Sequence, residues 1–131
     1  GFIRDLPHSL VDAFHATLEV ATHADLLLHV VDSASHARDE QVDEVNKVLR
    51  EIGADCVKQL VVWNKIDLTE AQPGVERGVY GNIARVRVSA RTGEGLDLLR
   101  ESLAEYARAK ADARQKAIAE AEFEAQHDYI N

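Results

Sequence analysis

The polar run Asn-Lys-Ile-Asp at positions 64–67 follows directly after the apolar run 60–63. An ionised Asp67 can accept two hydrogen bonds at once, and such charge-assisted, two-pronged bonds are strong and geometrically selective. Guanine presents a matching pair of donors, its ring N–H and its exocyclic amine, whereas adenine would leave the carboxylate partly unpaired. The Asn64 amide can bridge the base edge to neighbouring backbone, and the stem of Lys65 can cover the flat face of the base. Residues of these types at this spacing could therefore bind a base that presents two adjacent N–H donors.

A second segment, Ser89-Ala90-Arg91, begins 22 residues after Asp67. It ends a short alternating run at 84–88 that is typical of a strand, and the residues 92–95 that follow it open a helix. Small side chains at Ser89 and Ala90 would let a backbone N–H approach the carbonyl oxygen of the base. An ordinary strand-to-helix turn could contain the same tetrapeptide at 64–67, but two such segments in this order favour a nucleotide site.

The elements that would position these residues alternate between helices and strands. Ser9 and Asp12 resemble a capping box, and apolar residues every four positions then predict a helix to about Thr22. The near-continuous apolar run 26–31 predicts a strand buried on both faces of a parallel sheet. A helix is expected from Asp39, ending in a left-handed cap at Gly53. The strand 60–63 comes next.

The segment 69–82 predicts a loop or at most a short helix, because of its glycines and Pro73. The alternation over 84–88 predicts a strand at the sheet margin with one solvated face. A last packed helix is expected to about Tyr106, and residues 107–126 are helical by propensity but weakly amphipathic. The order predicts an α/β fold with three parallel strands, flanking helices and a C-terminal helical extension.

Composition narrows the class of protein. The chain has 131 residues, enough for one small domain, and its net charge of -8 argues against a general nucleic-acid or DNA coat. No apolar run reaches membrane-spanning length, no secretory leader is visible, and the single Cys56 suits a reducing cytoplasm. The six histidines show no metal-ligand spacing, so no metal site is expected. His29 and Trp63 are interpreted as core residues.

The two segments resemble the guanine-binding boxes of P-loop GTPases. The run Gly-Phe-Ile-Arg-Asp-Leu-Pro-His at 1–8, together with 26–32 and 64–68, closely resembles the HflX-type ribosome-associated GTPases over about residues 1–106. The resemblance implies a partial P-loop GTPase (Ras-like) G domain: residues 1–106 would be its C-terminal half, and 107–131 a helical tail or linker. By position, Gly1 would meet the γ-phosphate. The base would be met by Asn64, Lys65 and Asp67, and its carbonyl by Ser89, Ala90 and Arg91.

Membership of this family implies GTP or GDP binding and Mg²⁺-dependent hydrolysis. It also implies binding to the RNA and protein of the large ribosomal subunit, and splitting or rescue of stalled ribosomes under stress. The chain contains no G-x-x-x-x-G-K-[ST] loop, so the Mg²⁺ ligands are expected in an N-terminal half that is missing here, and the chain alone is expected to be inactive. No catalytic residue is assigned, because Phe2 stands where Ras-like enzymes have a water-orienting Gln.

Two other interpretations stay open, and a third is disfavoured. The chain could come from another translation-factor-class GTPase, or it could be an interaction module that has lost nucleotide binding. A flavodoxin-like receiver domain is disfavoured, since it would not explain Asp67 and Ser89-Ala90 together. A basic cluster in the tail is interpreted as a solvated helix face rather than an RNA contact; it comprises Arg108, Lys110, Arg114 and Lys116.

Overall fold

The computed structural model of the chain describes residues 12 and 16–130. Gly1, Phe2 and the segment 1–8 that carries the family resemblance lie outside the described residues, as do Ser9 and Phe14 of the expected first helix. Residues 16–18 are helical, and the 3-10 helix η1 (Glu19–His23) follows them. The chain divides into two compact units, of which the second begins at Asp97.

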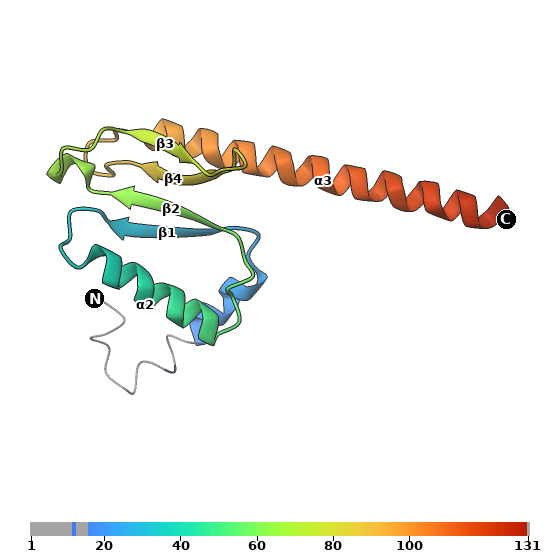
Figure 1. Ribbon diagram of the computed structural model, residues 1–131, viewed down its shortest axis with the longest axis horizontal. Coiled ribbons are helices and arrows are strands. Elements are labelled where there is room, and N and C mark those ends of the chain that lie inside the picture. Colours follow the sequence, from blue (N-terminus) through green and yellow to red (C-terminus); the bar gives the residue numbers. More distant parts are fainter. Residues whose placement is uncertain (1–11, 13–15, 131) are drawn as a thin grey trace. The chain divides into compact units, whose positions relative to one another are not determined.

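A four-stranded sheet forms the first unit, in the order β1-β2-β4-β3 (Figure 1). The three strands β1 (Leu27–Asp32), β2 (Gln59–Asn64) and β4 (Ile83–Arg87) run parallel, whereas β3 (Gly74–Arg77) is antiparallel to β4. The prediction of an α/β fold with three parallel strands is thereby confirmed.

The strand register brings the carboxyl ends of the parallel strands together. Asp32 at the end of β1 is level with Asn64 at the end of β2, and Trp63 is level with Arg87 at the end of β4. Ligands of open α/β sheets bind outside this edge. The polar residues at 64–67 and 89–91 therefore follow neighbouring strands at the edge where such sheets bind ligands.

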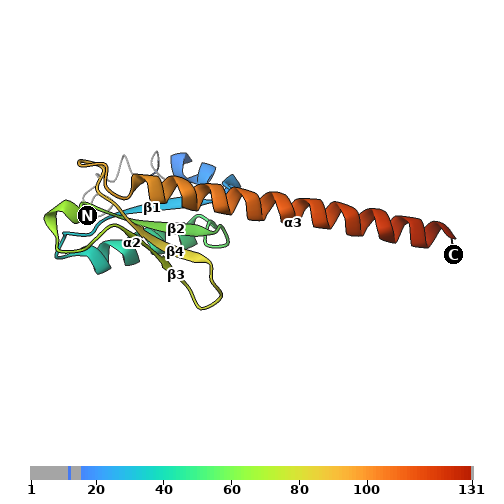
Figure 2. The same ribbon diagram turned by 90° about the horizontal axis from the view of Figure 1, so that it is seen from above.

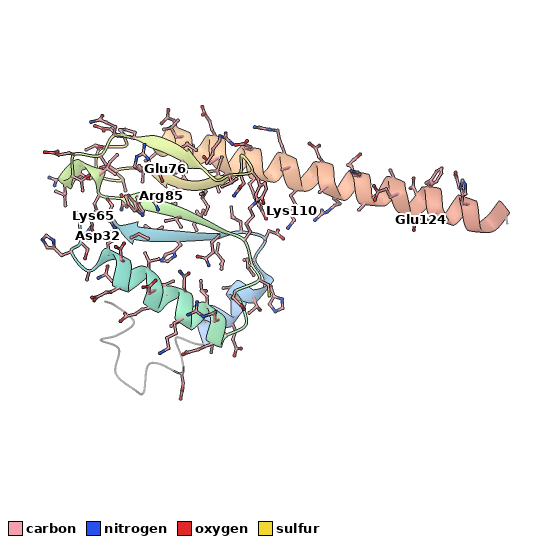
Figure 3. The ribbon with its side chains drawn as sticks, in the orientation of Figure 1. Asp32, Lys65, Glu76, Arg85, Lys110 and Glu124 are labelled. Atoms are coloured by element: carbon pink, nitrogen blue, oxygen red, sulfur yellow. The ribbon has the colours of Figure 1, made fainter. Side chains whose placement is uncertain are left out.

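Strand β3 corrects two predictions. Residues 74–77 were expected to lie in a loop, and β4 was expected at the sheet margin, but β3 pairs with β4 and places it inside the sheet. The physical reason is the antiparallel backbone pairing of a hairpin, across which Glu76 on β3 forms ion pairs with Arg85 and Arg87 on β4. Figure 3 labels Glu76 and Arg85. The alternating arginines thus face a partner strand.

The prediction that β1 is buried on both faces is wrong. His29 and Val31 are buried, but Leu28 and Val30 on the opposite face are 44% and 60% exposed. Side chains alternate between the two faces of a strand, so only the His29 face is covered. The helix α2 (Arg38–Glu51) contacts β1 and contributes Val48 and Leu49 to the core. The other buried apolar residues are Ala54, Leu60, Val62, Ile66, Val86 and Val88.

Helix α2 ends as expected. Gly53 has φ +78° and no helical continuation, and the N–H of Ala54 donates to the carbonyl of Leu49 over 2.8 Å. A glycine is favoured at this left-handed position because it has no Cβ to clash.

The second unit consists of the helix α3 (Leu96–Ile130) from Asp97 onward, and Figure 2 shows this helix as one continuous element. The expected helical extension is therefore present as the distal part of α3, through residue 130. Its residues 111–127 are all exposed. In the part of the chain that the structure describes, no helix combines the length and the apolar composition needed to cross a membrane.

Candidate functional site

Asn64, the last residue of β2, joins three loops. Its backbone carbonyl accepts hydrogen bonds from the N–H of Ser33 (3.1 Å) and from the Ser33 hydroxyl (2.6 Å), just after β1. Its side-chain Oδ1 accepts a hydrogen bond from the N–H of Ala90 (2.9 Å), just after β4. Asn64 therefore fixes the relative positions of the segments that follow β1, β2 and β4.

Lys65 is held in an uncommon backbone conformation. Its φ of 67° is the only positive φ of a non-glycine residue among the described residues, and such positions often mark functional sites. Its Nζ lies 3.1 Å from Asp32 Oδ2, a pairing that Figure 3 shows at the end of the sheet. The hydrogen bond from Lys65 is the main reason that the pKa of Asp32 is lowered, and the N–H of Ala34 also supports that carboxylate.

Asp67 lies in the 3-10 turn η2 (Ile66–Leu68). The turn is anchored by Ile66, whose side chain is buried and whose N–H donates to the carbonyl of Val88 over 3.3 Å. The Asp67 carboxylate is exposed at the surface, and its Oδ1 accepts a hydrogen bond from the Ser89 hydroxyl over 2.8 Å. The carboxylate is thus oriented by the protein and still accessible to a ligand.

The loop after β4 is tightly closed around Ser89, which is fully buried. The Ser89 N–H donates to the carbonyl of Glu94, its carbonyl accepts from the N–H of Gly93, and its Oγ accepts from the N–H of Thr92. Gly95 has φ +81°, and a Cβ there would stand 2.4 Å from the carbonyl oxygen of Arg87. The loop geometry therefore requires glycine at position 95.

The structure brings six of the seven predicted site residues into neighbouring loops at one sheet edge: Asn64, Lys65, Asp67, Ser89, Ala90 and Arg91. The seventh, Gly1, lies outside the described residues. Ala90 and Arg91 are exposed. The Asp67 carboxylate is an oriented acceptor for adjacent N–H donors, and it lies in the loop beside that of Ala90, whose N–H is bonded to Asn64 Oδ1.

Sequence reasoning missed two contributors, Asp32 and Ser33. Their signal was present, because Asp32 ends the apolar run of β1 just as Asn64 ends that of β2, and the ends of adjacent parallel strands meet. The guanidinium groups of Arg38 and Arg85 stack on the Trp63 ring, 4.2 and 3.9 Å from its centre. These stacks attach the start of α2 and strand β4 to the residue before Asn64. Within the described residues, no group of three or more His, Cys, Asp or Glu could hold a metal ion.

Comparison with known proteins finds relatives that share one name. The chain is 47% identical over 103 residues to the GTPase HflX of Caldanaerobacter subterraneus subsp. tengcongensis, covering 79% of this chain and 23% of that protein. It is 46% identical over 106 residues to the GTPase HflX of Escherichia coli strain K12, covering 80% and 25%. No protein-family model matches the chain. The chain spans about a quarter of the length of these curated relatives.

Proposed function

Since the chain belongs to the HflX-type GTPases, we propose that its loops after β2 and β4 bind the guanine base of GTP and GDP for a GTP-hydrolysing protein. The observation that carries the proposal is the 2.8 Å hydrogen bond from the Ser89 hydroxyl to Asp67 Oδ1. This bond holds a carboxylate, the acceptor that two adjacent N–H donors need, at the surface beside the exposed Ala90 loop.

Each site residue has a separate proposed role. Asp67 accepts the ring N–H and the exocyclic amine of guanine. The N–H of Ala90, which donates to Asn64 Oδ1, turns to the base carbonyl, and the Asn64 amide then contacts the base edge. The stem of Lys65 covers the base face, and Arg91 borders it. Gly1 is proposed to meet the γ-phosphate.

The remaining parts of the proposal come from the family resemblance. Residues 1–106 would belong to the G domain and 107–131 would form its tail. The large ribosomal subunit is the proposed partner of the whole protein, and a cytoplasmic location follows from that partner. Mg²⁺ is the proposed metal of hydrolysis, and the described residues contain no group of three or more His, Cys, Asp or Glu that could hold it.

The test is an NMR titration of the ¹⁵N-labelled chain with guanosine and, separately, with adenosine. Guanosine should shift the amide signals of Lys65, Asp67 and Ala90 in a saturable manner, and Asp67→Ala should abolish the shifts. Adenosine should leave these signals in place. Equal responses to both nucleosides, or no response to guanosine, would overturn the proposal and favour an interaction module without nucleotide binding.

A further inference from the structure

The distal part of α3 is an uncovered helix surface. All residues from 111 to 127 are exposed, and they include Ile118 at 53% and Phe123 at 62%. Phe123 lies against His127 of the same helix, with ring centres 4.5 Å apart. Most of the stability of a protein helix comes from packing of one face rather than from propensity. Ile118 is therefore a large apolar side chain that packing of a second helix would cover.

Charge is divided between the two halves of this surface. Residues 108–116 contain four cations and one acid, Asp112, whereas residues 117–127 contain Glu120, Glu122 and Glu124 and no Lys or Arg. The two halves therefore carry charge of opposite sign, and each half is complementary to the other half of a second, identical helix that runs in the opposite direction.

We propose that α3 pairs antiparallel with α3 of a second copy of the chain, with Ile118 facing Ile118 of the copy. In this register, a residue a given number of positions before Ile118 in one copy lies level with the residue the same number of positions after Ile118 in the other copy. Arg114 then lies level with Glu122, and both are one turn from Ile118 on its own face. Ala111 and Ala125, seven positions before and after Ile118, extend the seam and let the helices approach closely.

The charges select a second copy as the occupant. A uniformly acidic or basic partner would match one half of the helix and repel the other, whereas an identical antiparallel helix matches both halves. Lys116 also lies level with Glu120, but both are turned about 160° from the seam and contribute nothing to it. The like charges Asp112 and Glu124 also become level, but each is six residues from Ile118 and is turned about 120° from the seam. The pairing requires no nucleotide, so it is independent of the proposed base site.

Disulfide formation tests the register directly. The background variant is Cys56→Ser, which removes the exposed free cysteine. In that background, Ile118→Cys should form an intermolecular disulfide on mild oxidation, because the two residues meet at the two-fold axis and disulfides need close Cβ atoms. The matched control is Ala107→Cys, whose copies would be about 33 Å apart in the antiparallel pair. Crosslinking at both positions would indicate parallel or nonspecific association, and crosslinking at neither would indicate no pairing; both results overturn the proposal.

Charge reversal tests the complementarity. Arg114→Glu and Glu122→Arg should each raise the dimer dissociation constant about tenfold, because each places like charges beside each other at two symmetric sites. An equimolar mixture of the two variants should associate like the wild-type chain, since both sites then pair opposite charges. Sedimentation equilibrium measures the constants, and circular dichroism confirms that each variant keeps its helix.

Two further outcomes contradict the pairing. A wild-type chain that stays monomeric, or variants that associate as strongly as the wild type, would exclude it. A monomeric chain that binds single-stranded RNA, and loses this binding in Arg114→Glu, would assign the basic half to nucleic acid instead.

Discussion

The hydroxyl of Ser89 donates a hydrogen bond to Asp67 Oδ1 over 2.8 Å, although the two residues belong to loops after different strands. Ser89 is fully buried and held by its own loop, whereas Asp67 is exposed. A rigid, buried group therefore orients an accessible carboxylate before any ligand arrives. Such preorganisation reduces the entropy that is lost when a ligand binds.

The base preference should change in Asp67→Asn. The amide offers one acceptor and one donor, whereas guanine presents two donors and xanthine has a carbonyl in place of the amine. GTP binding should weaken at least about tenfold, and xanthosine triphosphate should bind more tightly than to the wild type. The measurement uses a chimera in which this chain replaces the matching segment of the Escherichia coli relative. Unchanged GTP affinity would remove Asp67 from the site.

Ser89→Ala should weaken guanine nucleotide binding without changing base preference. The variant removes the donor to Asp67 and also the acceptor for the N–H of Thr92, at a cost of about 1 kcal/mol or more. Equilibrium titration of the same chimera with fluorescent GDP should therefore show a several-fold higher dissociation constant. Ser102→Ala is the matched control, because Ser102 is also buried but bonds only the Leu98 carbonyl within α3. Equal effects of the two variants would indicate general destabilisation.

Asp32→Asn should weaken nucleotide binding by a smaller factor, about two- to fivefold. Both partners of the Asp32–Lys65 pair are partly exposed, so the ion pair itself contributes less than about 1 kcal/mol. The expected effect of the substitution is to change the position of the Lys65 side-chain stem. Asp39→Asn is the control, since Asp39 forms a 3.5 Å pair with Arg38 and is 90% exposed. Tighter GDP binding in Asp32→Asn would contradict a positioning role.

The sequence was sufficient to predict the three parallel strands and the loops of the site. Apolar runs that end in polar residues mark strands whose carboxyl ends meet at one edge, so Asn64 and Ser89 could be brought together without coordinates. The left-handed cap at Gly53 was likewise predictable, because glycine is the residue that best tolerates this conformation.

Strand β3 could not be predicted in the same way. Its four residues are too few to show a period, and it is a strand through its pairing with β4, which includes ion pairs from Glu76 to Arg85 and Arg87. Likewise, the exposure of Leu28 and Val30 depends on which elements cover β1, which strand composition alone does not specify. Local pattern thus predicted elements with strong periodicity, and tertiary contacts determined the others.

The stability of the fold should decrease as the pH drops below neutral, partly because of His29. Burial lowers the pKa of His29 from its usual 6.5, an effect that exceeds the opposing influence of its hydrogen bond with Gln59. A folded-state pKa below the unfolded value means that the unfolded chain takes up the proton first, so stability is lost as pH falls through 6.5 and below. The loss of unfolding free energy between pH 7 and pH 5, measured by urea unfolding, should be smaller in His29→Gln than in the wild type. The control His36→Gln, at an exposed position, should keep the wild-type difference.

Gly95→Ala should be far more damaging than Gly81→Ala, although both glycines have φ +81°. Each alanine would bear the cost of a left-handed conformation, about 1 kcal/mol. At Gly81 a Cβ would have nothing within 4 Å, but at Gly95 it would stand 2.4 Å from the carbonyl oxygen of Arg87 and 3.1 Å from the Cα of Val88. Backbone cannot move aside as a flexible side chain can, so the loop that holds Ser89 must shift.

Urea unfolding should show an additional loss of roughly 1–3 kcal/mol in the free energy of unfolding for Gly95→Ala. GDP binding by the chimera should weaken only in this variant. Equal losses for the two variants would mean that the close approach at Gly95 does not constrain the loop.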